Sequence, residues 1–152
     1  MTRVRRTIRI DHTADNLFEL VSGIETYPDF IKWILSMAVK PVSSSGTTME
    51  RIGTAQVGFR GFSETFATKV VSDAEARTVE VSLVRGPLKH LNNSWKFIPR
   101  GDSTDVEFFV DFEFKNLILR ALASANFELA MTRIMAAFVS EADRRYGRSS
   151  AT

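Results

Sequence analysis

Hydrophobic and polar residues alternate from residue 3 to residue 10, which is the period of a half-buried β-strand. One side of this alternation carries Val4, Ile8 and Ile10, and the other carries Arg3, Arg5 and Arg9. Arg6 interrupts the apolar side. The pattern predicts a first strand, residues 3–10, with a basic outer face.

Two short helices are predicted after this strand. Thr13 is a suitable N-cap for a helix that runs through Val21 and ends at Gly23, and Asp15 in its first turn favours the helix dipole. Thr26 is expected to start a second short helical piece, TYPDFIKWIL, over residues 26–35. Its many apolar residues predict that it lies against the core or at a cavity mouth.

After Lys40-Pro41 the apolar period becomes two and remains so for most of the chain, with turn signals at intervals. These signals are residues 43–46, 58–61, 72–73, 86–87 and 100–102. Successive antiparallel hairpins are therefore expected. The apolar faces of the clearest strands carry Phe62, Phe66 and Val70, then Val79, Val81 and Leu83, then Asn93, Trp95 and Phe97, then Val106, Phe108, Val110, Phe112 and Phe114.

A long final helix is predicted from the N-cap Asn116 to about Tyr146, with Gly147 at its end. Its length would be about 45 Å. Two adjoining faces are apolar, and we expect both to lie across the sheet: Ile118, Leu122, Ala125, Leu129 and Ala136 on one, and Ala121, Met131, Met135 and Phe138 on the other. Residues 1–147 then form a single domain, and residues 148–152 a disordered tail.

The composition narrows the classes of protein. The chain of 152 residues has no cysteine, so disulfides, thiolate nucleophiles and cysteine-ligated metals are excluded. Twelve phenylalanines predict a core or cavity lined by rings without polar groups. The net charge of +2 gives no reason to expect a DNA partner. No secretory signal or stretch of about 18 apolar residues is evident, so we expect a protein that is cytoplasmic or peripheral on the inner face of the respiratory membrane.

The order of elements predicts an α+β fold, in which an antiparallel sheet of about seven strands wraps around a long C-terminal helix. This order resembles the START-like helix-grip superfamily, which includes polyketide cyclases. Four segments are similar to the coenzyme Q-binding protein family, also called the ribosome-association toxin family in bacteria. They are residues 27–33 (YPDFIKW), 58–66 (GFRGFSETF), 86–97 (GPLKHLNNSWKF) and 112–116 (FEFKN).

The resemblance implies a non-enzymatic carrier or chaperone for ubiquinone or a related polyprenyl lipid, in support of respiratory electron transport or quinone biosynthesis. No cofactor is required, and ubiquinone is the expected ligand. The expected partners are a polyprenyl quinone or another hydrophobic small molecule, and an anionic membrane surface. A rival role is that of a ribosome-binding regulator that blocks association of ribosomal subunits. A weaker alternative is a polyketide cyclase or aromatase.

Aromatic and methionine side chains suit such a ligand because they line a cavity without demanding hydrogen bonds. For each residue alone, a place in a solid core is the alternative interpretation. The candidate ligand-binding residues are Tyr27, Phe30, Trp33, Phe59, Phe62, Glu64, Phe66, Trp95, Phe108, Phe112, Met131 and Met135. The alternation places Glu64 on the apolar face, where it pairs with Arg51 or Arg60 or meets a ligand head group.

No catalytic or metal site is predicted. His12 and His90 are the two histidines, and neither has a recognisable serine or aspartate relay beside it in the sequence. Arg3, Arg5, Arg6 and Arg9 open the chain, and Arg144, Arg145 and Arg148 close it. These cations either meet anionic lipid or ribosomal RNA, or are simply solvated.

Overall fold

The computed structural model describes residues 2–59 and 61–147, without the side chains of Phe59 and Phe62. Seven strands, one 3-10 helix and two α-helices follow one another in this part of the chain. Their bounds are β1 (Thr2–Ile10), α1 (Ala14–Ser22), η1 (Ile24–Asp29), β2 (Ile34–Ser45), β3 (Thr48–Phe59), β4 (Phe62–Asp73), β5 (Thr78–Arg85), β6 (Leu88–Arg100), β7 (Ser103–Phe114) and α2 (Leu117–Tyr146). The predicted tail, residues 148–152, lies outside the described residues.

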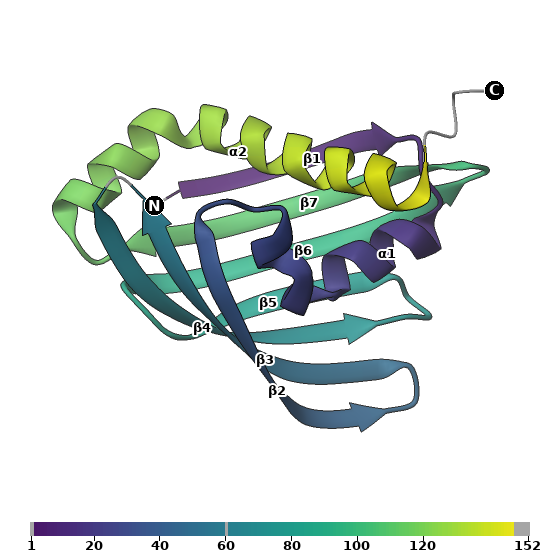
Figure 1. The fold of residues 1–152 in the computed structure, drawn as a ribbon, viewed down its shortest axis with the longest axis horizontal. Helices are drawn as coiled ribbons and strands as arrows, with labels where there is room; N and C mark the ends of the chain where they lie inside the picture. The colour runs from purple at the N-terminus through teal and green to yellow at the C-terminus, as the bar shows by residue number, and fades with distance from the viewer. Residues whose placement is uncertain (1, 60, 148–152) are drawn as a thin grey trace.

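The strands form one antiparallel sheet in the order β1-β7-β6-β5-β4-β3-β2. Strands β2 to β7 follow one another as hairpins, while β1 pairs with β7 from Thr2 opposite Phe112 to Ile10 opposite Thr104. Helices α1 and α2 lie on the same side of the strongly curved sheet (Figure 1). We call this side the inner face and the other the outer face. The predicted helix-grip architecture is confirmed.

The segment TYPDFIKWIL differs from the prediction. Only its beginning is helical, as part of η1, and Ile34 and Leu35 already belong to β2. Phe30 leaves the helix with φ −134°, and the amide of Gly58 donates to the carbonyl of Trp33 at 2.9 Å. The prediction was wrong here because apolar residues at a strand start cannot be told from a short helix by periodicity alone.

The core lies between the sheet and the C-terminal half of α2. Phe138 is its centre, because its ring makes edge contacts with the rings of Tyr27, Phe30 and Trp95, at centroid distances of 5.4, 5.3 and 5.3 Å. One stripe of α2 supplies the buried residues Met131, Met135, Phe138, Glu141 and Ala142. We call this part of the molecule the closed end.

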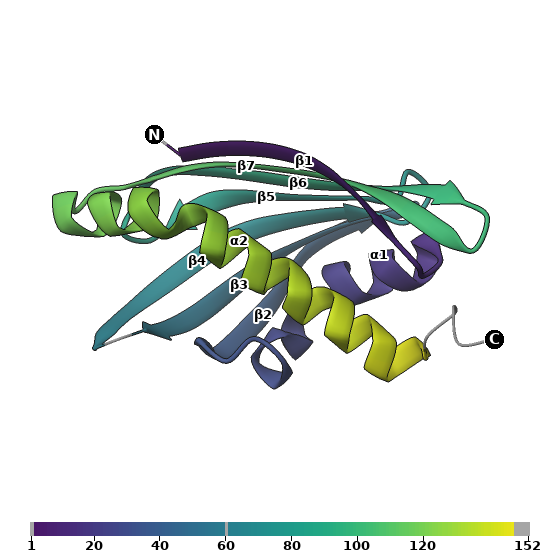
Figure 2. The ribbon, with the colours of Figure 1, turned by 90° about the horizontal axis from the view of Figure 1, so that it is seen from above.

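The N-terminal half of α2 corrects the prediction that both apolar faces of the helix lie across the sheet. Leu117, Ile118, Leu122 and Leu129 are exposed, with between 47% and 72% of their surface accessible. The helical stripe that contains Met131, Met135 and Phe138 faces the sheet, whereas the stripe that contains Ile118 and Leu122 points away from it. Figure 2 shows this half of the helix extending along one end of the sheet.

Candidate functional site

The inner face near the N-terminal half of α2 is apolar and incompletely covered, and we call it the open end. Phe112, near the end of β7, is half-buried and contacts the ring of Phe114 at 5.8 Å and that of Phe127 at 5.7 Å between centroids. Leu91 and Val4 are half-buried neighbours of the core. These side chains form an apolar surface that the fold leaves partly accessible.

Glu64 and Phe66 stand on this inner face. Their register partners on β3 are Val57 and Ala55. A Cβ on Gly53, in the same row of β3, would meet Ile24 of η1 and Met37, which shows that the row faces inward. Glu64 is half-buried and forms no hydrogen bond or ion pair with another described residue.

The expected Arg51 partner of Glu64 is engaged elsewhere. Arg51 donates to Glu25 at 3.2 Å and also to the carbonyl of Ser22, so it connects β3 to the end of α1 and the start of η1. Arg60 lies outside the described residues. The side chains of the candidates Phe59 and Phe62 do too, although the two backbones pair across the β3–β4 hairpin.

Tyr27, Phe30, Trp95 and Phe108 belong to the closed end. The hydroxyl of Tyr27 donates to the carbonyl of Val21, and burial raises the pKa of this phenol. The indole N–H of Trp95 donates to Oδ1 of Asn93 at 3.0 Å, so it is not free for a quinone carbonyl. The ring of Phe108 contacts that of Trp95 at 4.8 Å. Packing accounts for all four side chains.

The remaining candidates lie between the two ends. Met131 and Met135 are buried in the core, whereas Trp33 is half-buried against it, close to the start of β2. Methionine side chains adapt to the shape of what they contact. We regard the two methionines as the boundary between the closed core and the open apolar surface, where an adaptable side chain can contact either.

Phe114 and Phe127 were missed as site residues by the sequence reasoning. Phe114 stood on the predicted apolar face of its strand, so its position was available from the alternation. Phe127 lies four residues before Met131, a spacing that places both on one helical face. That signal was hidden because apolar residues occur on several faces of the N-terminal half of the helix.

Both histidines are held away from the open inner face. Nε2 of His12 lies 2.7 Å from Oδ1 of Asp143 near the end of α2, with the His12 ring almost fully buried. Nε2 of His90 lies 2.9 Å from Oδ1 of Asp111, and hydrogen bonds from His90 and Arg3 lower the pKa of Asp111. In the described part of the chain, no group of three histidine, aspartate or glutamate side chains is placed to hold a metal ion.

The arginines of β1 are largely neutralised by acidic residues of the same domain. Arg3 pairs with Asp111 at 3.1 Å and Arg9 with Asp105 at 2.6 Å, both across the β1–β7 ladder. Arg6 reaches the opposite side and pairs with Glu128 of α2, which explains why a cation interrupts the apolar side of β1. The predicted basic outer face is thus a face of ion pairs.

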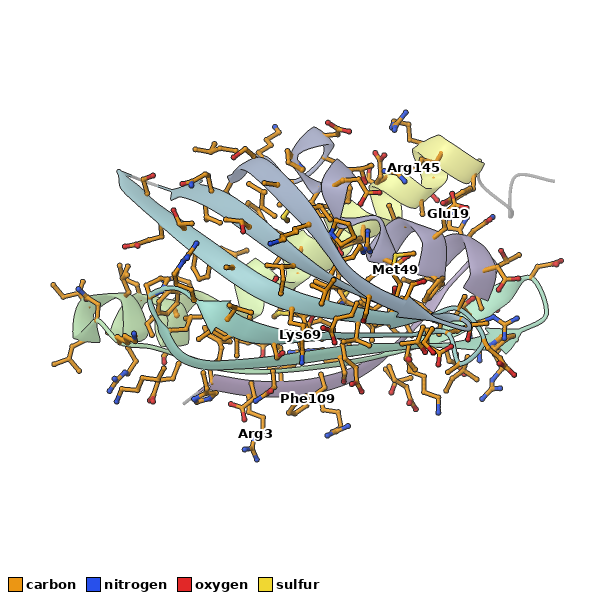
Figure 3. All side chains as sticks on the ribbon, turned by 90° about the horizontal axis from the view of Figure 1, so that it is seen from below. Arg3, Glu19, Met49, Lys69, Phe109 and Arg145 are labelled. Carbon is orange, nitrogen blue, oxygen red and sulfur yellow. The ribbon has the colours of Figure 1, made fainter. Side chains whose placement is uncertain are left out.

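An aromatic residue also lies on the outer face. The guanidinium of Arg5 stands 4.7 Å from the ring centroid of Phe109. In Figure 3, Arg3 and Phe109 lie on the side of the sheet away from Glu19 and Arg145, which belong to the two α-helices. A shallow depression of about 240 Å³ near Phe109 is lined mostly by polar residues, including Glu80, Ser94, Lys96 and Glu107. It offers little apolar surface for a lipid.

Known proteins agree with this architecture. The ribosome association toxin RatA of Rickettsia prowazekii is 26% identical over 141 residues, which are 91% of this chain and 94% of that protein. The mitochondrial coenzyme Q-binding protein COQ10 homolog B of Xenopus laevis is 29% identical over 90% of this chain and 56% of its own length. The solution structure of the 18 kDa protein CC1736 from Caulobacter crescentus is 41% identical, with a TM-score of 0.81, and covers 97% of this chain and 99% of that one.

A seven-stranded sheet closed on a long C-terminal helix, with an apolar inner face, is the START-like fold. Residues 10–139 match the family described as polyketide cyclase / dehydrase and lipid transport. The chain belongs to this family.

Proposed function

We propose that the protein is a non-enzymatic carrier for a hydrophobic small molecule, and that the ligand is ubiquinone or a related polyprenyl quinone. The observation that supports this proposal best is the apolar surface at the open end, formed by Phe112, Phe127 and Leu91. The fold does not cover these side chains fully. A ligand that completes their burial gains free energy from the hydrophobic effect.

The chemistry of a polyprenyl quinone fits this surface. Each buried CH₂ of an isoprenoid tail contributes about 0.8 kcal/mol, and a quinone ring stacks on phenylalanine. Glu64 is the polar side chain at the open end for which no described partner competes. It would orient the head group of the reduced quinol, whose hydroxyls donate hydrogen bonds to a carboxylate, while Phe66 and Phe112 flank the ring or the first isoprenoid unit.

The arrangement of titratable groups supports a carrier over a cyclase. An acid/base catalyst needs a proton-transferring side chain within reach of the substrate. Tyr27 and His12 are engaged in hydrogen bonds at the closed end, and His90 contacts Asp111 on the outer strand face. Glu64 would have to act without any of them, so we do not assign it a catalytic role.

The named relatives also support a second candidate, a regulator that binds ribosomal subunits. Contacts to RNA depend on unpaired Lys and Arg near phosphates. Arg3, Arg6 and Arg9 are each paired with a carboxylate of this chain, so they are poor candidates for that contact. This weighs in favour of the lipid carrier.

Two measurements test the carrier. Organic extracts of protein purified from its native host should contain a stoichiometric quinone by mass spectrometry, and a short-tailed ubiquinone should quench tryptophan fluorescence saturably. Phe112→Ala should weaken this binding about tenfold, which corresponds to about 1.4 kcal/mol. Glu64→Gln should weaken binding of the reduced, quinol form by less than the tenfold expected for Phe112→Ala, because the amide oxygen of glutamine still accepts a hydrogen bond from the head group.

Phe109→Ala is the matched control, because Phe109 lies on the same strand as Phe112 but on the outer face. Its affinity should remain that of the wild type. An empty extract together with no saturable quenching would reject the carrier. Salt-dependent co-sedimentation with ribosomal subunits would then support the second candidate.

A further inference from the structure

One end of the sheet collects apolar side chains that the fold leaves in solvent. The register places the start of β2 beside the end of β3, and the end of β5 opposite Ala67 in the middle of β4. The end of β7, opposite the starts of β1 and β6, leads directly into α2. The exposed apolar residues in the first two turns of α2 are Leu117, Ile118 and Leu122, which we call the apolar rim. Leu35 on β2 and Val84 on β5 are also exposed, but Leu35 lies against Gly58 on the outer face of the sheet.

The rim lies on one segment, the first turns of α2, where Leu117 and Ile118 are neighbours in the chain and Leu122 follows Ile118 by one helical turn. Figures 1 and 2 show this segment at one end of the molecule. Their exposed fractions range from 47% to 72%. Large apolar residues gathered in this way mark an interaction surface rather than the scattered exposure of an ordinary protein surface.

Cations without partners accompany the rim. Lys32 precedes β2, Arg85 ends β5, and Lys115 precedes α2. All three are exposed and form no ion pair with another described residue. By contrast, the nearby carboxylate of Glu113 is neutralised by Lys89 at 3.8 Å and Arg120 at 3.6 Å. The potential around the rim is therefore positive.

Helix α2 adds a further observation. It has an 18-residue window of mean hydropathy 1.2, of which 11% is buried, so by length and composition it would qualify as a membrane span. This differs from the expectation that no such stretch exists. Most of this apolar character faces neither the sheet nor the core. Arg120 in the first turn donates to the carbonyl of Phe114, and the C-terminal half carries Glu141, Arg144 and Arg145, so the exposed large apolar side chains of α2 lie in its first half.

We propose that the apolar rim docks on the surface of a lipid bilayer that contains anionic lipids. Apolar side chains enter the acyl boundary, while Lys32, Arg85 and Lys115 meet the anionic head groups, the combination that holds interfacial proteins on membranes. The charges favour an anionic bilayer, because the exposed apolar side chains of the rim occur together with exposed cations that have no acidic partner among the described residues.

The docking adds a partner to the proposed function. Its role in lipid transfer rests on the proposal that the protein carries a polyprenyl quinone. The rim borders the open end, so a docked domain would direct Phe112 and Phe127 toward the lipid. A polyprenyl tail then moves between bilayer and protein along apolar surface without crossing water. The Arg3 and Arg9 side chains, paired across the β1–β7 ladder, take no part in this contact.

Flotation with lipid vesicles tests the docking. Wild-type protein should float with vesicles of phosphatidylcholine and phosphatidylglycerol, and much less with phosphatidylcholine alone. Leu117→Ser/Ile118→Ser should lower the bound fraction at least tenfold on the same vesicles. Arg85→Gln/Lys115→Gln should lower the apparent affinity for the anionic vesicles about tenfold, and added salt should remove that difference.

The matched control is Val42→Ser/Met49→Ser, which removes two exposed apolar side chains from the opposite ends of β2 and β3. It should float like the wild type. Flotation that is absent in the wild type, or lowered equally by the control, would overturn the docking. Loss of ribosomal subunit co-sedimentation in the rim variants, without any flotation, would assign the rim to that partner instead.

Binding of a short-tailed quinone in solution separates the two proposals. Rim variants should retain the wild-type affinity, because none of the substituted residues lies among the inner-face aromatics. Flotation without quinone binding would leave the docking standing and remove the carrier. Quinone binding without flotation would remove the docking and leave the carrier.

Discussion

The two halves of α2 carry similar apolar residues, but these residues differ in how completely the fold buries them. In the C-terminal half, Phe138 is buried among Tyr27, Phe30 and Trp95, and the polar atoms of Tyr27 and Trp95 have hydrogen-bond partners. In the N-terminal half, Phe127 and Phe112 contact each other but remain half-buried, and Leu117 and Ile118 are exposed. Folding completes the first set of contacts and leaves the second incomplete.

This difference separates stability from function within one helix. The closed end supplies the packing free energy that holds the sheet on α2, so substitutions there should be costly. The open end keeps apolar surface in solvent, which a protein tolerates at a binding site. The predictions below contrast the two ends, from the largest expected effect to the smallest.

Phe138→Ala should have the largest effect on stability. It removes a ring at the centre of the closed end and leaves a cavity, so the free energy of unfolding should fall by about 3–5 kcal/mol. Phe127→Ala is the matched change at the open end and should cost less than half as much, because its ring is only partly buried. Urea denaturation measures both. Equal losses would contradict the comparison.

Glu141→Gln should cost about 2 kcal/mol at neutral pH. Hydrogen bonds from Arg144 and Arg145 lower the pKa of Glu141 to about 2, below the 4.5 of an unperturbed glutamate. Because the folded pKa is depressed, this stabilisation is complete above about pH 5 and is lost as the pH falls toward 2. Urea denaturation of the variant and wild type across this range should show their difference shrinking.

Glu128→Gln provides the control for that experiment at the other half of the helix. Glu128 pairs with Arg6, but three quarters of its side chain is exposed. Exposed ion pairs contribute about 0–1 kcal/mol. The difference in the free energy of unfolding between Glu128→Gln and the wild type should therefore depend little on pH. A dependence as large as that of Glu141→Gln would argue against assigning the effect to the ion pairs of Glu141.

Phe127→Ala should weaken binding of a short-tailed ubiquinone by about tenfold, or about 1.4 kcal/mol. Its ring contacts Phe112 at the open end, where the ligand is proposed to lie. Fluorescence titration under conditions where the variant is fully folded measures the effect. Unchanged affinity would place the ligand elsewhere on the molecule.

Leu117→Ser/Ile118→Ser should have the smallest effect on stability, within about 0.5 kcal/mol for each exposed position. Both side chains lie in the first turn of α2, just after the N-cap Asn116, and pack against little. Thermal unfolding is a sufficient measurement. A large decrease would show that the rim has a structural role, and vesicle flotation of this variant would have to be interpreted accordingly.

The sequence by itself determined the fold and the order of elements. Alternation located the four C-terminal strands, because one face of each had to be apolar, and Asn116 and Gly147 marked the ends of α2 through local capping chemistry. The predicted resemblance was confirmed: residues 10–139 match the family described as polyketide cyclase / dehydrase and lipid transport, and relatives named RatA and COQ10 homolog B are similar over 90% or more of the chain. The ligand and the ligand-binding residues remain predictions.

Tertiary structure decided which apolar residues are core and which are accessible. Phe108 and Phe112 occupy equivalent positions in the alternation of β7, yet the first is buried by Trp95 while the second lies beside a half-exposed Phe127. The pairing of Arg3 with Asp111 and of Arg51 with Glu25 likewise depends on strand register and helix placement. Local pattern specifies a face of an element, but what covers that face is set by contacts between residues far apart in the chain.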